Sequence, residues 1–300
     1  MRPEHRRAAL RLLDSLEADA GNAAAVRIGL TGAPGTGKST LLDALVRQVR
    51  SQGRTAGIIA VDPSSSRTGG ALLGDRIRVR SRAGDPGVFF RSMAARSRLG
   101  GLADAARAGV IVLSSAFDVV FVETVGVGQS EGDVAGLVDT LVYLAQPGAG
   151  DMLQFMKAGI LELPDLFVVN KADLGSSATR TASELEAGLA LGERTGDGWV
   201  PPVVLVSARD DKGIDALADA LEAHRTASVG SGQLAERRRG GRDAFVRDAI
   251  LKRYGSYGLE AIGGAEALAE RLRRREKASG FALADAVSRE IEDKLGRQQR

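Results

Sequence analysis

The stretch that decides the fold is VRIGLTGAPGTGKSTLLDALVRQVR, residues 26–50. Residues 26–31 predict a buried strand, and residues 39–50 predict an amphipathic helix with leucine and valine on one face. Between them, residues 32–39 (GAPGTGKS) match the pattern G-x-x-x-x-G-K-[ST]. A strand, a glycine-rich turn and a helix in this order predict a phosphate-binding loop.

The spacing inside this loop follows from what phosphate binding requires. Its glycines let successive main-chain N–H groups converge on phosphate oxygens, and the helix adds the positive end of its dipole. We expect Lys38 to reach the β- and γ-phosphates and the Ser39 hydroxyl to ligate Mg²⁺. The nucleotide-binding residues predicted here are Gly32, Ala33, Pro34, Gly35, Thr36, Gly37, Lys38, Ser39 and Thr40.

Short apolar runs alternate with helical stretches along the rest of the chain. The runs are residues 56–61, 88–90, 119–123, 141–144, 166–170 and 203–206, and the clearest helices between them are 102–113 and 214–223. The pattern predicts an α/β fold, a mainly parallel sheet flanked by helices, with a short N-terminal helix and a C-terminal helical extension. A composition shift at SVGSG (228–232) marks one domain boundary. The expected parts are an N-terminal helical arm (1–25), a nucleotide-binding domain (26–228) and a C-terminal helical segment (229–300).

Composition narrows the class of protein. The chain has no Cys and two His, so disulfides and thiolate metal sites are excluded. No apolar stretch reaches the roughly 18 residues of a membrane span, and the first residues lack the apolar core of a signal peptide. We therefore expect a soluble, cytoplasmic protein that binds no membrane. The basic runs AERRRGGR (235–242) and RLRRREK (271–277) have few aromatic neighbours, which predicts solvated helix surface and no nucleic-acid binding.

The base-reading residues follow the apolar strand at 166–169. The motif is Asn170-Lys171-Ala-Asp173, in which the Asp173 carboxylate can accept hydrogen bonds from guanine N1–H and the 2-amino group. Adenine lacks that pair of donors, so the motif favours GTP over ATP. We expect Asn170 to tie loops together and Lys171 to lie along the ring plane. The residues Ser207, Ala208 and Arg209 would offer main-chain N–H groups to the guanine carbonyl.

A third motif, DVVFVETVGVGQ (118–129), delivers an acidic residue at the end of an apolar strand. Glu123 can hold Mg²⁺ directly or through water, and the Gly126 N–H can contact the γ-phosphate. Ras-type GTPases usually have D-x-x-G-Q here, but this chain has Val127 at the Gln position. Gln129 is a candidate for orienting water at a shifted spacing, and its alternative is a loop residue facing solvent or a partner.

These segments together resemble one family. The runs VDPSSSRTGGALLGDR, FFRSMAARSRLGGL, FVETVGVGQSE and QPGAGDMLQFMKAGILELPDLFVVNKAD are similar to the MeaB/MMAA/ArgK GTPases of the SIMIBI class, almost continuously from residue 26 to about 207. The resemblance implies a GTP-dependent chaperone of an adenosylcobalamin-dependent acyl-CoA mutase, chiefly methylmalonyl-CoA mutase. Such chaperones gate cofactor loading and protect or reactivate the mutase.

The resemblance also implies roles for residues outside the three motifs. Asp62 and Asp75 would join Ser39 and Glu123 around one Mg²⁺, which prefers oxygen ligands. The alternatives are a turn-capping Asp62 before Pro63 and a surface Asp75 paired with a nearby arginine. The segment 148–157 aligns with a switch loop that signals to the mutase. Its residues of interest are Asp151, Gln154 and Lys157.

The C-terminal residues predict amphipathic helices, which in the family form a homodimerisation arm. The alternative is that they pack on their own chain, because an amphipathic helix needs some apolar partner and not a particular one. For the activity we expect slow GTP hydrolysis that the bound mutase accelerates. Other functions left open are a phosphotransferase acting on a basic amino-acid transport component, a nickel metallochaperone GTPase, which the scarcity of His and absence of Cys disfavour, and a nucleotide-sensing scaffold.

Overall fold

A computed structural model describes residues 3–18, 24–63, 84–95, 101–124, 134–148, 163–191, 198–276 and 278–298. Within these ranges the sheet-forming part contains β1 (Val26–Gly32), α3 (Lys38–Ser51), β2 (Ala56–Pro63), β3 (Val88–Ala95), α5 (Gly101–Ser114), β4 (Val119–Thr124), β5 (Thr140–Ala145), β6 (Leu166–Val169), the short 3₁₀ helix η3 (Ala172–Leu174), α8 (Ser176–Leu191), β7 (Val203–Leu205) and α9 (Ile214–Gly230). The helices outside it are α1 (Pro3–Glu17), α10 (Gln233–Ala261), α11 (Gly264–Arg274) and α12 (Gly280–Gln298).

The seven strands form one sheet in the order β3-β2-β4-β1-β5-β6-β7, and every pairing between them is parallel. Alternate residues of β4 face opposite sides: Val119 and Phe121 pack with α3 and α9, and Val120 and Val122 pack with α5. The strand is buried throughout, as a parallel sheet covered on both faces requires. The predicted α/β class is therefore confirmed, and β1 with its following loop lies in the middle of the sheet.

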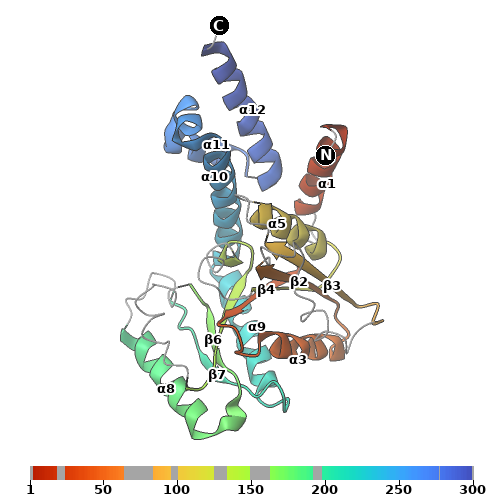
Figure 1. Cartoon of the computed structure of the whole chain (residues 1–300), viewed down its shortest axis with the longest axis vertical. Coiled ribbons are helices and arrows are strands. Elements are labelled where there is room, and N and C mark those ends of the chain that lie inside the picture. Colours follow the sequence, from red (N-terminus) through yellow and green to blue (C-terminus); the bar gives the residue numbers. More distant parts are fainter. Residues whose placement is uncertain are drawn as a thin grey trace.

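The helices after α9 form a separate helical unit next to the sheet-forming part. They extend away from it in Figure 1, and both ends of the chain lie at that far side. A separate apolar cluster holds them together, made of Val246, Ile250, Ile262, Leu268, Leu272, Leu283, Val287 and Ile291. The turn between α9 and α10 has Gly232 at φ +80°, a left-handed conformation that glycine adopts without strain.

The expectation that the basic runs are solvated is wrong for part of the first run. Arg242 is only 6% exposed, and Arg238 lies mostly buried with two hydrogen bonds to Asp139, of 2.7 and 2.6 Å. Arg238 reaches from α10 to acceptors in the sheet-forming part of the chain, Asp139 and the Ala25 carbonyl. Arg242 instead donates to the carbonyl oxygens of Glu276 and Ala278, between α11 and α12, and pairs with the adjacent Asp243. No helix in the described ranges combines the length and apolarity that a membrane crossing requires.

A buried polar cluster around Asp165, just before β6, joins the sheet to α9 and α10. Its carboxylate accepts hydrogen bonds from Arg237 of α10 at 2.7 Å and from the Leu141 N–H at 2.7 Å, and His224 of α9 lies 3.4 Å away. The His224 ring also contacts the Thr140 hydroxyl at 2.8 Å. Burial opposes ionisation, but the bonds to His224 and Arg237 outweigh it and hold the pKa of Asp165 below its usual value.

Asp165→Asn is expected to lower the free energy of unfolding by about 3 kcal/mol at pH 7, because it leaves Arg237 without its buried counter-charge. A carboxyl with a depressed pKa stabilises the fold above its unfolded pKa, near 3.9, and that stabilisation is lost as the pH falls through the folded value. The difference between wild type and variant should therefore shrink below about pH 4. Urea unfolding at pH 7 and pH 3.5 measures it, with the exposed Asp219→Asn as control. Equal stability at pH 7 would contradict the assignment.

Candidate functional site

The phosphate-loop sequence begins at the carboxyl end of the central strand β1 and leads into α3. Its glycines at 32, 35 and 37 have φ angles of +141°, +84° and +93°, which other residues rarely adopt. A Cβ on Gly32 would lie 2.3 Å from the Leu144 carbonyl oxygen, and one on Gly37 would lie 2.4 Å from Asn170 Nδ2. The close approach of strand and loop therefore requires glycine at both positions.

The side chain of Lys38 folds back onto the loop that precedes it. Its Nζ donates hydrogen bonds to the carbonyl oxygens of Gly32, at 2.6 Å, and Ala33, at 2.9 Å, and the residue is 7% exposed. Thr36 Oγ1 also donates to the Ala33 oxygen, at 2.9 Å, which tightens the turn. Lys38 and the amino end of α3 together direct positive charge at the space above the loop, the arrangement that suits a phosphate group.

Ser39 and Glu123 meet beside the loop. Because β1 and β4 are neighbours with Leu30 opposite Glu123, the acidic side chain reaches the first turn of α3. Ser39 Oγ donates to Glu123 Oε1 at 2.8 Å, and both residues are buried. One strand position further, Thr124 Oγ1 donates to Thr31 Oγ1 at 3.0 Å. A hydroxyl and a carboxylate are the oxygen ligands that Mg²⁺ prefers.

Several other predicted site residues lie wholly or in part outside the described residues. The main chain of Asp62 pairs with Ala94 at the end of β2, one residue beyond the pair of Val61 with Thr124, so it lies at the same edge of the sheet. Its side chain lies outside what the structure describes. The residues Asp75, Gly126, Gln129, Asp151, Gln154 and Lys157 also lie outside the described ranges.

Asn170 joins the phosphate loop to the loop after β7. Its Nδ2 donates to the Thr36 carbonyl at 2.8 Å, and its Oδ1 accepts from the Ala208 N–H at 3.2 Å. The residue is 3% exposed, so both bonds are shielded from water. This is the tie between loops that the sequence predicts for Asn170, and it fixes the distance between the phosphate-binding and base-reading segments.

Lys171 and Asp173 lie on the more exposed side of the contacts by which Asn170 joins the two loops. Lys171 has a φ of +61° and donates from Nζ to the Gly35 carbonyl at 2.8 Å, and to Gln146 Oε1 at 3.2 Å. Its stem therefore spans from the base-reading motif to the phosphate loop. Gln146 was not among the sequence-predicted residues, although its place directly after the buried strand β5 was a usable signal.

The carboxylate of Asp173 is oriented by the loop after β7. Oδ1 accepts from Ser207 Oγ at 2.8 Å, and Oδ2 lies 3.0 Å from the Arg209 guanidinium. The Ser207 N–H donates to the Lys212 carbonyl at 2.9 Å, and the Ala208 N–H is used by Asn170. The expected contact with a guanine carbonyl would therefore share the Ala208 N–H or use that of Arg209.

A parallel sheet with a phosphate loop at its central strand, a serine–carboxylate pair and a base-reading motif defines the class of P-loop nucleotide-binding proteins. The family model described as "Methylmalonyl Co-A mutase-associated GTPase MeaB" matches residues 1–256. The chain belongs to this family of GTPases, and guanine-nucleotide binding follows for it.

Named relatives agree with this assignment. The chain is 50% identical over 214 residues to a putative GTPase of Pyrococcus abyssi, covering 71% of this chain and 66% of that protein. It is 38% identical over 215 residues to the mouse protein named methylmalonic aciduria type A homolog, mitochondrial, covering 71% of this chain and 52% of that protein. The matched part thus spans between half and two thirds of these two relatives.

Solved structures support the fold. A crystal structure of an LAO/AO transport system kinase is similar with a TM-score of 0.62 and 25% identity, covering 97% of this chain and 99% of that one. The structure of HypB from Helicobacter pylori in complex with nickel has a TM-score of 0.52 at 16% identity, covering 74% and 96%. At that identity the second likeness concerns the fold alone.

Proposed function

We propose that this protein hydrolyses GTP slowly and, through that cycle, acts as a chaperone of an adenosylcobalamin-dependent acyl-CoA mutase of the methylmalonyl-CoA mutase type. The nucleotide part rests on the two hydrogen bonds of Asn170, which join the phosphate loop to the loop after β7 and so set the Asp173 carboxylate at a fixed distance from the phosphate loop. The mutase part rests on the description of the family to which the chain belongs.

Ser39 and Glu123 are the described residues that would hold Mg²⁺. Their oxygens lie 2.8 Å apart at the end of the phosphate loop, and a site of one or two carboxylates completed by substrate phosphates is usual for this ion. Asp62 and Asp75 remain proposed additional ligands. When bound, Mg²⁺ neutralises charge on the β- and γ-phosphates. In the described ranges no cluster of three or more His, Cys, Asp or Glu side chains could hold a metal by itself.

The chain's own residues would then have two separate roles, in stabilising the phosphate charge and in binding the base. Lys38 and the loop N–H groups stabilise the charge that develops on the γ-phosphoryl oxygens, while Asp173 and the loop after β7 hold the base. Val127 stands at the position where Ras-type proteins have the water-orienting Gln, so we expect a low intrinsic rate. Gln129 is the proposed substitute for that Gln.

The proposed interactions beyond the nucleotide follow the same family assignment. The mutase would contact the segment containing Asp151, Gln154 and Lys157, and residues 229–300 would form a homodimerisation arm next to a GTPase domain of residues 26–228. The N-terminal arm would be residues 1–25. We propose a cytoplasmic protein that binds neither nucleic acid nor a membrane, a proposal that the composition of the chain supports.

A phosphotransferase remains the second proposed function, because the solved structure with a TM-score of 0.62 is named a transport system kinase. A kinase would transfer the γ-phosphoryl group to a protein acceptor, whereas a GTPase releases it as inorganic phosphate. The nickel-delivery alternative has weaker support, since the chain has no Cys and two His.

Single-turnover hydrolysis of GTP labelled on the γ-phosphate tests the proposal. We expect a rate well below about 1 per second for the protein alone, the scale of partner-activated small GTPases, and at least about a tenfold increase with the mutase, because a partner supplies transition-state groups that the chain lacks. An unrelated acyl-CoA enzyme at the same concentration is the control. A rate above about 1 per second without partner, or one that the mutase leaves unchanged, would contradict the chaperone cycle, and label on a protein would favour the kinase.

A further inference from the structure

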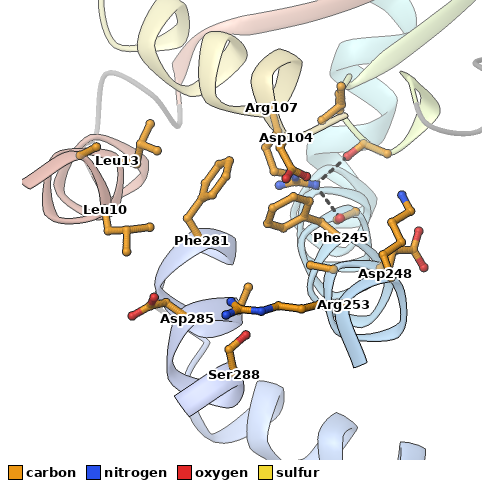
Figure 2. A pocket seen from close by; sticks show the side chains of 18 of the residues that line it. Leu10, Leu13, Asp104, Arg107, Phe245, Asp248, Arg253, Phe281, Asp285 and Ser288 are labelled. Atoms are coloured by element: carbon orange, nitrogen blue, oxygen red, sulfur yellow. Dashed lines mark hydrogen bonds between the residues drawn. The ribbon is translucent and has the colours of Figure 1, made fainter. Parts of the chain in front are cut away.

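Arg107 of α5 is a buried cation at the junction between the sheet and the C-terminal helices. It is 6% exposed, and Nη2 donates to the carbonyl oxygens of Gly241 at 2.5 Å and Gly136 at 3.3 Å (Figure 2). Its guanidinium carbon lies 4.9 Å from the centre of the Phe245 ring. Its Nε is buried and has no hydrogen-bond partner among the described residues. A buried donor of this kind calls for an acceptor.

Arg107 lines a cavity of about 640 Å³ between β1, α5 and α10. The charged residues of its lining, from every described element that borders it, are Glu17, Arg27, Arg107, Arg238, Arg239, Arg242 and Glu276. Five guanidinium groups thus face two carboxylates. Most of the remaining wall is apolar and includes Val110 and Ile111 of α5. Arg27 is as buried as Arg107, while Arg239 stands at the more exposed side.

With the neighbouring Asp139 and Asp243 included, four carboxylates stand against the five guanidinium groups, which leaves an excess of one positive charge. Asp139 pairs with Arg238, Asp243 with Arg242 and Glu276 with Arg239, each at 3.2 Å or less. Arg107 and Glu17 form only a long ion pair, with 3.9 Å between nitrogen and oxygen, and the other Glu17 oxygen accepts from the Gly280 N–H.

The pKa values of Arg27 and Arg107 are both lowered, chiefly by burial. Burial, and next the charge of Arg238, lower the pKa of Arg27 to about 10. Burial is also the main cause that lowers the pKa of Arg107; the nearby Glu17 opposes this shift, and Arg242 adds a smaller contribution to it. A nearby anion would oppose both shifts, because it stabilises the charged guanidinium.

A second cavity on the other side of Arg107 differs in character. It has a volume of about 580 Å³ and lies between α1, α10 and α12, with Phe245 and Phe281 in its wall (Figure 2). Besides the shared Arg107, its charged residues mix both signs: Arg6, Lys252 and Arg253 stand against Asp104, Asp248 and Asp285. This lining favours no charge type, so the argument for a ligand applies to the arginine-lined cavity alone.

We propose that the arginine-lined cavity is a binding site for a small multivalent anion bearing phosphate or carboxylate groups. Guanidinium forks match both kinds of oxyanion, and partly desolvated pairs of this kind are the strong ones. The volume lies in the range of small-molecule sites. An anion there would bridge Arg27 at the start of β1, Arg107 on α5 and the arginines of α10, so it would stabilise the contact between the C-terminal helices and the sheet.

Calorimetric titration of the full chain with inorganic pyrophosphate, and separately with citrate, tests this site. Saturating GDP is present throughout, so that the phosphate loop does not contribute. We expect one saturable site and a higher Tm with at least one of the two anions, and no such effect from potassium chloride at equal ionic strength. Binding of pyrophosphate alone would assign a phosphate ligand, and binding of citrate alone a carboxylate ligand.

Two substitutions on α10 form a matched pair. Arg239→Gln, at the exposed side of the cavity, should raise the Kd about fivefold or more, since it removes one charged donor. Arg247→Gln removes the same charge from the same helix at a residue whose side chain is 58% exposed and does not line the cavity, so the Kd should not change. Arg107→Lys should weaken binding further, while Arg239→Gln keeps the test valid if that buried variant fails to fold. Absence of saturable binding, or equal weakening by the two Gln variants, would overturn the proposal. The arginines would then serve only to hold the C-terminal helices against the rest of the chain.

Discussion

Lys38→Ala is expected to lower the single-turnover rate of GTP hydrolysis by about 1000-fold while leaving the fold intact. Lys38 is the one charged residue in the loop GAPGTGKS, and its ammonium lies 2.6 and 2.9 Å from two loop carbonyls, already positioned over the phosphate-binding curve. Removing a single preorganised hydrogen-bond donor typically costs 100- to 1000-fold in rate, and a full charge belongs at the upper end. The effect falls on the transition state, in which charge is spread over the γ-phosphoryl oxygens.

The measurement combines single-turnover kinetics with thermal unfolding of the same preparations. Lys252→Ala, an exposed lysine on α10 far from the loop in sequence, is the matched control and should retain the wild-type rate. The Tm of Lys38→Ala should stay within a few degrees, because the Lys38 bonds are to carbonyls that its own loop presents. A Lys38→Ala rate within about tenfold of wild type would show that charge stabilisation comes from elsewhere.

The sequence predicted the sheet well where a strand is buried on both faces. Such strands are continuous apolar runs, as at 119–123 and 141–144, and the structure has β4 and β5 there. The predicted strand was shorter than β3: the strand runs from Val88 to Ala95, although only residues 88–90 were expected. Arg91 and Ser92 interrupt the apolar run, and an edge strand pairs along one side only, so it needs less apolar surface.

The contacts of the site depend on strand order, which local sequence does not specify. The bond between Asn170 and the phosphate loop could be expected, because both segments follow strands and carboxyl ends of parallel strands share one edge. The contacts of Lys171 with Gln146 and of Thr31 with Thr124 could not, because they require knowing that β6 lies beside β5 and that β1 lies beside β4.

The arginine-lined cavity escaped prediction for the same reason. Arg27, Arg107 and Arg242 are each ordinary basic residues in a local pattern, and they converge only once α10 has packed against α5 and β1. A basic run on a helix is usually solvated, so the pattern predicted a surface where the structure has buried side chains.

Asp173→Asn is expected to weaken GTP binding about 1000-fold and to create binding of xanthosine triphosphate. The carboxylate presents two acceptor oxygens, and guanine presents two donors, N1–H and the 2-amino group. Asparagine replaces one acceptor with a donor, so one guanine donor loses its partner and two donors face each other. Sites built to hydrogen-bond a substrate group discriminate by 10⁴- to 10⁵-fold against ligands that lack it, and partial loss here should approach that scale. Xanthine has an oxygen at position 2, which can accept the bond that the new amide offers.

The neighbouring carboxylate Asp210 provides a matched control. It bonds the same two side chains as Asp173, Ser207 at 3.1 Å and Arg209 at 3.0 Å, and those bonds hold its pKa below the usual value. It lies outside the base-reading motif, so Asp210→Asn should bind GTP within a few-fold of wild type. Competition of GTP and xanthosine triphosphate for a fluorescent guanine nucleotide measures all three proteins. If Asp173→Asn and Asp210→Asn weakened GTP binding equally, the loss would come from a disturbed loop after β7, and Asp173 would not be the residue that selects guanine. Gain of xanthosine triphosphate binding by Asp173→Asn alone can arise only from contact with the base, since a disturbed loop loses affinity for every nucleotide.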